Sequence, residues 1–391
     1  MIPNKKKVKI LLISEIQPIS GTASSELLKR HLDQHSLSYH GIDETHPALY
    51  RGALDRLLLK VLSWFSESFR QCYVESIEPI FKSRKIANTI GDKHFDVVLS
   101  LAHGRLGLHA WKVGKHLGIP TVTLFHDWWP EMLQSYRGKR DLVVRSVERD
   151  FRLAAQNADM CLSVCPGMAR RITPGSRSDV LYPIPDASIT PSNICRTRQI
   201  LRVSYTGSLW NPYGRMLCDL VSQIKGSTEF FLRIHGDVKY IEEPIKSQLL
   251  RLGILNNYIF GDSFIRCIQD ESDVLLAVMG RDAEGECRMA TSFPSKIANY
   301  FQTGNAVLLW ALKGSSLEEF AREYDYPWVV SEADPTAVVK MLKQMANDPT
   351  VLATARADSL RIREQVFNAN KIQRQFEQSL HEALLSFSKK L

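Results

Sequence analysis

Residues 291–308 read Thr-Ser-Phe-Pro-Ser-Lys-Ile-Ala-Asn-Tyr-Phe-Gln-Thr-Gly-Asn-Ala-Val-Leu. The triplet Pro294-Ser295-Lys296 predicts the start of a short helix, because proline and serine favour the first positions of a helix. Gly304 ends that helix, and the apolar run from Ala306 predicts a buried strand directly after it. A short helix followed at once by an aliphatic strand is typical of an α/β domain with a parallel sheet.

The start of this helix also predicts an anion site. The first backbone N–H groups of a helix have no partner within the helix and favour negative charge. Ser295 is at that position, and Lys296 adds a positive charge. These residues are therefore candidates for binding a phosphate group.

The same alternation of strand and helix extends through the chain with a period of about 30 residues, which is typical of βαβ units. Pro183, Pro185 and Pro191 lie in a polar segment that predicts a linker. We therefore expect an N-terminal Rossmann-like domain over residues 1–190 and a second one over 191–365. Residues 366–391 are expected to form a C-terminal helix that packs back on the first domain. Buried strands are predicted at residues 8–14, 95–100, 120–125, 160–164, 201–205, 230–237, 274–278 and 306–310.

Composition narrows the class of protein. The 391 residues are 44% hydrophobic and 24% charged, as in globular domains, and no apolar run has the ~18 residues of a membrane-spanning helix. The seven cysteines contain no C-x-x-C pair, which indicates reduced thiols and predicts no metal site. The N-terminal apolar run is too short for a signal peptide. We therefore expect a cytoplasmic protein.

Positive charge is concentrated in the first half of the chain. Residues 1–200 hold 28 basic and 19 acidic side chains, a balance of +9, whereas residues 201–391 hold 22 and 23, a balance of −1. Such an excess suits an anionic partner such as a phospholipid surface, although a generally basic surface kept for solubility explains it equally well. The basic residues do not interleave with aromatic ones in a known module, so nucleic-acid binding is not expected.

One segment has no strand character. Residues 53–81 predict an amphipathic helix, with apolar side chains at helical spacing and basic residues beside them. Two interpretations stay open: a helix that faces the core, and an interfacial helix at the inner face of the cell membrane.

Candidate catalytic residues follow a strand of the first domain. His126 and Asp127 come directly after the strand at 120–125, so His126 is a candidate to bind a hydroxyl or move a proton, with Asp127 orienting it. The alternative is that His126 caps the next helix. His103 follows the preceding strand and is a weaker candidate, for acceptor binding. Gly21, after the first strand, would let the backbone approach a ligand.

A second loop of this kind opens the second domain. Gly207 and Ser208 lie between a strand and a helix, where backbone N–H groups can hold a phosphate. Arg215, on the helix, could reach the same phosphate. A tight turn without ligand is the alternative interpretation.

The run from Pro294 to Leu308 resembles the donor-site signature of retaining GT-B glycosyltransferases of the family 4 type. Val8 to Gly21, Pro120 to Pro130 and Tyr205 to Ser208 resemble segments of that family in order and spacing. The resemblance implies a GT-B architecture of two Rossmann-like domains facing a cleft. It also implies transfer from a UDP- or GDP-sugar to a polysaccharide or lipid-linked glycan, with retention and without a cofactor.

The same resemblance implies roles for residues. Lys296, the Gly207 loop and Arg215 would stabilise the diphosphate that leaves, and His126 would bind the sugar. The family usually carries two glutamates, at the positions of Thr291 and Asn299. Asn299 can still bind ribose hydroxyls, and Glu284 or Glu286 is a candidate to supply the missing carboxylate. The loss of both glutamates motivates an alternative function, a degenerate GT-B protein that binds a nucleotide sugar or glycan without turnover.

Overall fold

Short aliphatic runs and amphipathic helices alternate along the chain, and the computed structural model gathers them into two units. Residues 1–182 with 373–391 form the first unit, and residues 183–372 form the second. The structure describes residues 7–14, 23–33, 37–42, 53–65, 70, 73, 83–84, 86–88, 90, 93–103, 106–130, 141–172, 175, 177–191, 200–209, 211–224, 226–236, 243–251, 255–256, 262–280 and 286–389.

The first unit contains a six-stranded sheet with the order β2-β1-β3-β4-β5-β6, and every recorded pairing is parallel. Its strands are β1 (Val8–Ile13), β2 (Leu37–Ile42), β3 (Val97–Leu101), β4 (Thr121–Phe125), β5 (Met160–Ser163) and β6 (Arg177–Val180). Every residue of β3, β4 and β5 is buried. This burial explains why the central strands are almost continuously apolar.

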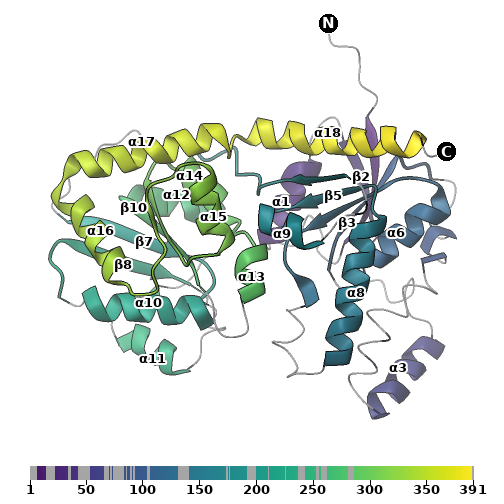
Figure 1. Cartoon of the computed structure of the whole chain (residues 1–391), viewed down its shortest axis with the longest axis horizontal. Helices are drawn as coiled ribbons and strands as arrows, with labels where there is room; N and C mark the ends of the chain where they lie inside the picture. The colour runs from purple at the N-terminus through teal and green to yellow at the C-terminus, as the bar shows by residue number, and fades with distance from the viewer. Residues whose placement is uncertain are drawn as a thin grey trace, which may run out of the picture. The chain divides into compact units, whose positions relative to one another are not determined.

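Helices cover this sheet and one of its edges (Figure 1). They are α1 (Ala23–Leu32), α6 (Leu106–Leu117), α8 (Asp141–Asn157), α9 (Pro166–Ile172) and most of α18 (Ala369–Ser388). The first unit also contains α3 (Ala53–Phe65). α6 packs against β3, β4 and α8. α18 contacts the edge strand β6 through Arg177–Glu382 (2.8 Å) and Ser379 Oγ–Asp179 Oδ2 (2.9 Å). The last helix thus protects a strand edge that would otherwise be open.

The second unit has a parallel sheet with the order β12-β11-β10-β7-β8-β9. The strands are β7 (Leu201–Thr206), β8 (Phe230–His235), β9 (Leu255–Asn256), β10 (Val274–Met279), β11 (Ala306–Ala311) and β12 (Val329–Val330). The chain adds strands outward from β7 on one side, then returns to β10 on the other. That order is the doubly wound arrangement of nucleotide-binding domains.

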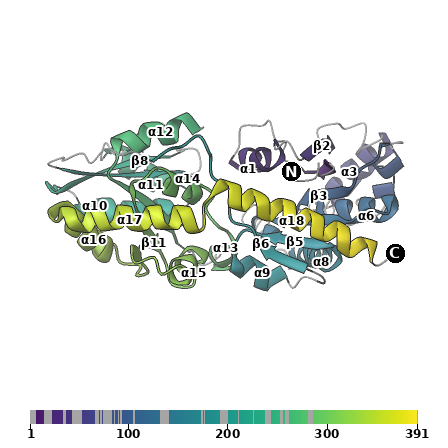
Figure 2. The same cartoon turned by 90° about the horizontal axis from the view of Figure 1, so that it is seen from above.

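The helices of the second unit are α10 (Asn211–Ile224), α11 (Glu243–Arg251), α12 (Asp262–Glu271), α13 (Glu286–Thr291), α14 (Lys296–Gln302), α15 (Ser316–Glu323), α16 (Thr336–Asn347) and α17 (Pro349–Gln365). α10, α11 and α16 bury apolar side chains against β7, β8, β10 and β11. α17 runs along β11, as Figure 2 shows. The core of this unit is therefore a sheet between helices, as the sequence predicts.

An aspartate fixes the start of one strand against its neighbour in both sheets. The carboxylates of Asp96, Asp159 and Asp273 accept hydrogen bonds from the backbone N–H of Lys9 (2.8 Å), Thr121 (3.0 Å) and Arg202 (3.0 Å), respectively. Each aspartate N–H in turn donates to the carbonyl of the same partner, at 2.8 Å. These reciprocal pairs set the register where β3, β5 and β10 begin.

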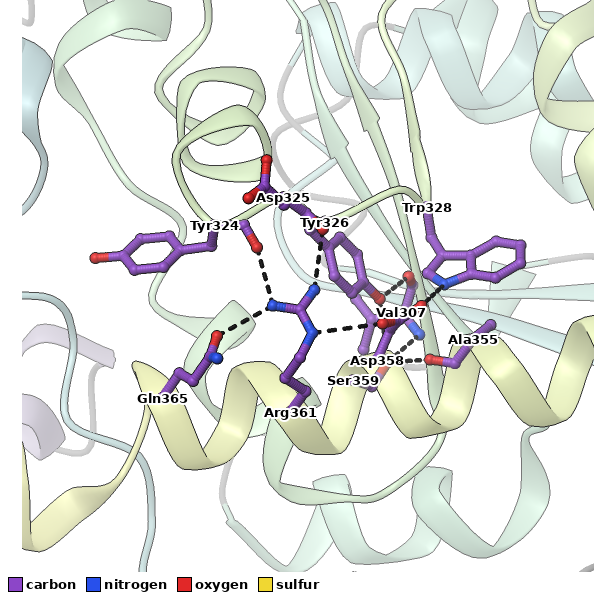
Figure 3. Close-up of polar contacts among 10 residues, drawn as sticks. All are labelled: Val307, Tyr324, Asp325, Tyr326, Trp328, Ala355, Asp358, Ser359, Arg361 and Gln365. Carbon is purple, nitrogen blue, oxygen red and sulfur yellow. Dashed lines mark hydrogen bonds and ion pairs between the residues drawn. The ribbon is translucent and has the colours of Figure 1, made fainter.

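A polar network attaches α17 to the sheet of the second unit (Figure 3). Ser359 Oγ accepts a hydrogen bond from Val307 N (3.1 Å), donates to Ala355 O (2.9 Å) and lies 3.0 Å from the Tyr326 hydroxyl. Arg361 donates to the carbonyls of Tyr324 and Asp325, both at 3.0 Å. Val307 and Ser359 are fully buried, so these bonds satisfy groups that no water reaches.

The predicted helix at 53–81 is observed as α3, which ends at Phe65; of the remainder, only residues 70 and 73 are described. Its apolar stripe is open to solvent: Leu54, Leu57 and Trp64 are 82%, 59% and 90% exposed. The interpretation as a core-facing helix is therefore wrong for these side chains. Among the side chains of α3 that the structure describes, only Leu59, on the other side of the helix, is buried.

Candidate functional site

The carboxyl end of β7 lies where the second sheet reverses its order. β7 is flanked by β8 on one side and by β10 on the other. Loops that leave neighbouring strands in opposite directions open a crevice at that point, where ligands of α/β proteins bind. Gly207 and Ser208 follow β7 directly, so both predicted loop residues lie at this crevice.

Gly207 adopts a conformation that other residues avoid. Its φ is +130°, and its N–H donates to His235 O at 2.9 Å, which ties the loop to β8. A Cβ on Gly207 would lie 2.9 Å from Lys296 Nζ. The position therefore favours glycine for its backbone angle, and a Cβ there would also displace the end of the Lys296 side chain.

Lys296 begins α14 and reaches back to this loop. Its Nζ donates a hydrogen bond to Thr206 O (2.7 Å) and lies 3.9 Å from the centre of the Tyr205 ring. Burial lowers the pKa of Lys296 to about 7. An ammonium group with only a carbonyl and an aromatic face beside it is a favourable place for an anion. A bound anion would stabilise the protonated form of the lysine and so raise its pKa again.

Two tyrosines that the sequence analysis does not select complete the cluster. The Tyr300 hydroxyl accepts a hydrogen bond from Thr206 N (2.9 Å), and the Tyr205 hydroxyl donates to Ser208 O (2.5 Å). Both side chains are fully buried. A signal for Tyr300 exists in the sequence, because the i, i+4 spacing from Lys296 places both on one face of a helix.

The other predicted residues of the 286–299 segment have protein partners. Thr291 is buried and donates its hydroxyl to Cys287 O (2.8 Å), while Asn299 Oδ1 accepts from Asp186 N (2.9 Å). Ser295 caps α14 by position, but its side chain makes no capping hydrogen bond. Glu286 begins α13, and its side chain lies outside the described part. Thr291 thus supports the helix, and Asn299 holds the segment that connects the units.

Ser208 belongs to the loop, and Arg215 lies in the first turns of α10, the helix that follows it. Both are exposed. His235, at the end of β8, is buried opposite Thr206 in the sheet register, and burial lowers its pKa. The local sequence predicts only a strand around His235, because nothing in it shows that β7 and β8 are neighbours.

In the first unit, His103 and His126 follow the adjacent strands β3 and β4. His103 stacks on Trp129 with ring centroids 4.8 Å apart. Burial lowers the pKa of His126 to about 4; nearby His103 and His31 add to the effect, and Asp127 opposes it. His126 is therefore a neutral imidazole at physiological pH, able to donate one hydrogen bond and accept another.

Gly21, a metal site and a membrane-spanning helix are the remaining subjects of the sequence-based predictions. Gly21 lies outside the described residues. Within the described ranges, no group of three or more His, Cys, Asp or Glu side chains could hold a metal ion. Within the same ranges, no helix has both the length and the apolarity to cross a bilayer.

Known proteins resemble this chain in one segment of its sequence and in its fold. Residues 74–186 match the model of Glycosyltransferase Family 4, a segment that includes His103 and His126. The structure is similar to that of a glycosyltransferase from Rickettsia africae ESF-5, with a TM-score of 0.60 at 11% identity over 97% of this chain and 99% of that one. The chain has the GT-B fold.

The GT-B likeness extends to other enzymes. The lipopolysaccharide outer core galactosyltransferase WaaB superposes with a TM-score of 0.56 at 14% identity, covering 96% of this chain and 99% of WaaB. A variant of S. aureus TarM superposes with a TM-score of 0.54 at 10% identity over 76% of this chain, which spans 59% of that longer protein. No curated protein matches the sequence. The GT-B fold and the family match together support an enzyme of the glycosyltransferase class.

Proposed function

We propose that this protein is a retaining glycosyltransferase that moves a sugar from a UDP- or GDP-sugar to a glycan or lipid-linked acceptor. The observation that carries the proposal is the contact between Lys296 and the Gly207 loop at the crevice of the second sheet. A lysine held against a glycine loop suits a diphosphate, because the diphosphate is negatively charged both in the bound donor and after it leaves the sugar. The similar TarM structure contains UDP and alpha-GlcNAc-glycerol.

The second unit is assigned to the donor nucleotide. Lys296, the Gly207 loop and Arg215 stabilise the diphosphate as its bond to the sugar breaks, and Asn299 and Ser295 contribute neutral hydrogen bonds. Departure of the diphosphate leaves an oxocarbenium-like sugar, which the acceptor hydroxyl attacks on the same face while its proton passes to the departing diphosphate. Stabilising a leaving diphosphate is the largest electrostatic task in such a reaction.

The first unit is assigned to the sugar and the acceptor. His126 is neutral, so it binds a sugar hydroxyl by hydrogen bonding and does not supply a positive charge. Asp127 orients it, and His103, stacked on Trp129, offers a polar edge beside an aromatic face for the acceptor.

The acceptor proposal includes a membrane surface. The exposed stripe of α3, with Leu54, Leu57 and Trp64 beside the exposed Lys60, suits insertion into the interface of an anionic bilayer. The balance of +9 in residues 1–200 adds long-range attraction. A lipid-linked acceptor would be presented at that surface.

Release of nucleoside diphosphate from a panel of UDP- and GDP-sugars tests the activity. We expect release from one donor, accelerated by a glycan acceptor, and a product whose anomeric configuration by NMR equals that of the donor. Binding of a nucleotide sugar without release over the whole panel would contradict the proposal. An inverted product would contradict retention alone.

A further inference from the structure

The Gly207 loop is fixed at several atoms before any ligand arrives. The N–H of Thr206 is bound by the Tyr300 hydroxyl, the N–H of Gly207 by His235 O, and the carbonyl of Ser208 by the Tyr205 hydroxyl. Three elements, β7, β8 and α14, thus hold three consecutive residues. Because glycine is conformationally permissive, these bonds select the one conformation with a φ of +130° at the centre of the loop.

The Tyr300 hydroxyl takes the place of a hydrogen-bond acceptor from a neighbouring strand at Thr206. β7 pairs with β10 at Val203 and Ser204, two residues before Thr206. The Tyr300 hydroxyl supplies the acceptor for Thr206 N, and it also lies 3.1 Å from Thr206 Oγ1. A single buried hydroxyl therefore accepts the hydrogen bond that a neighbouring strand would otherwise accept. It also joins the loop to α14, the helix that carries Lys296.

Tyr205 has two separate tasks. Its hydroxyl holds Ser208 O, and the face of its ring lies under Lys296 Nζ at 3.9 Å. Thr206 O accepts one hydrogen bond from Lys296 Nζ, at 2.7 Å. The direction in which Lys296 presents its charge is thus set by Tyr205 and by the carbonyl that Tyr300 helps to fix.

We propose that Tyr205 and Tyr300 are positioning residues of the donor site, whose hydroxyls fix the Thr206–Ser208 loop so that Lys296 meets a nucleoside diphosphate in a preset geometry. The inference rests on the proposed function. Neither residue needs to touch the ligand, because both act through the loop and through Lys296.

The experiment compares Tyr300→Phe and Tyr205→Phe with the matched control Tyr326→Phe. Tyr326 is buried in the same unit, and its hydroxyl bonds to Val307 O (2.5 Å) and Ser359 (3.0 Å), at the α17 network shown in Figure 3. Calorimetry with UDP and GDP gives the affinity, and thermal unfolding gives the stability. We expect about 3- to 10-fold weaker binding in the two test variants and less than about twofold change in the control, at comparable loss of stability.

A double-mutant cycle with Lys296→Ala separates positioning from general destabilisation. If Tyr300 acts through Lys296, then Tyr300→Phe costs little further affinity once the lysine is gone, and the two effects are not additive. Wild-type binding with unchanged affinity in both tyrosine variants, or with equal losses in Tyr326→Phe, would overturn the positioning role and leave the proposed function standing. Failure of the wild-type protein to bind either nucleotide would overturn both.

Discussion

Lys296 carries the charge of the candidate donor site, and its surroundings are neutral. A carbonyl, an aromatic ring and a glycine loop surround its Nζ. Such neutral contacts orient the ammonium group without pairing its charge, so the charge of the protonated form is available to an arriving phosphate. Two predictions at the scale of this residue follow from that arrangement.

Replacing Lys296 with alanine should raise the KM for the donor and lower kcat. The loss of one charged contact to a diphosphate corresponds to about 2–4 kcal/mol of transition-state stabilisation. Steady-state kinetics measures both constants. Lys340→Ala, an exposed lysine on α16, is the control and should leave them unchanged. A folded Lys296→Ala protein with wild-type kinetics would exclude Lys296 from the donor site.

Nucleoside diphosphate binding should weaken as the pH rises from 7 to 9. Burial lowers the pKa of Lys296 to about 7 in the folded protein, so the ammonium loses its proton in this range, whereas a phosphate with a pKa of about 6 stays fully ionised. Binding below the lysine pKa needs no proton, and binding above it takes one up. Calorimetry in buffers of different ionisation enthalpy measures this uptake. Lys296→Arg should bind without pH dependence over this range, since arginine stays charged.

His126→Ala should reduce turnover by about tenfold while the affinity for free nucleoside diphosphate stays within about twofold. The reason is that His126 is assigned to the sugar. With its pKa near 4, the side chain does not titrate between pH 6 and 8, so it adds no inflection to the rate profile there. His116→Ala, exposed on α6, serves as control. A large loss of diphosphate affinity would place His126 in a different subsite.

At the scale of elements, the contact between α17 and β11 depends on a few buried polar atoms. Ser359→Ala removes the acceptor of the buried Val307 N–H, and no water can replace it (Figure 3). We expect the unfolding free energy of this unit to fall by about 1–3 kcal/mol. Urea denaturation measures the change. Thr354→Ala, which removes an exposed hydroxyl from the same helix, should cost less than about 0.5 kcal/mol; equal effects would contradict the argument.

At the scale of the whole molecule, the protein should bind anionic vesicles in a salt-sensitive manner. Insertion of the α3 stripe supplies one part of the affinity, and attraction of about 1 kcal/mol per nearby basic residue supplies the other. The second part should weaken between 0.1 M and 1 M salt, because the Debye length falls from ~10 Å to ~3 Å. Co-sedimentation with anionic and neutral liposomes measures both parts.

The double variant Leu57→Gln with Trp64→Gln should abolish most of this pelleting. Leu385→Gln, at a side chain of α18 that is 64% exposed, removes exposed apolar surface from another helix of the same unit and should pellet like the wild-type protein. Equal, negligible pelleting of the wild-type protein with both kinds of vesicle would remove the membrane from the proposal and would favour a soluble acceptor.

The sequence by itself determined the parts of this protein that depend on near neighbours. Central strands such as β3, β4, β10 and β11 are short apolar runs closed by turn residues, and their parallel burial follows from that pattern. The Gly207 loop and Lys296 could also be selected from the local sequence. The loop lies between a strand and a helix, and Lys296 lies at the start of a helix. The short strands β9 and β12, of two residues each, carry no such pattern.

Only the tertiary structure decided which of these boundaries meet. Tyr300 and Thr206 are 94 positions apart, and Lys296 and Thr206 are 90 apart, yet each pair is within hydrogen-bonding distance. The meeting depends on the order of strands in the sheet, which no local pattern contains. The same holds for the pKa values of Lys296 and His126, because desolvation is the sum of everything packed around a group. Periodicity is a property of a segment, whereas burial and neighbourhood are properties of the fold.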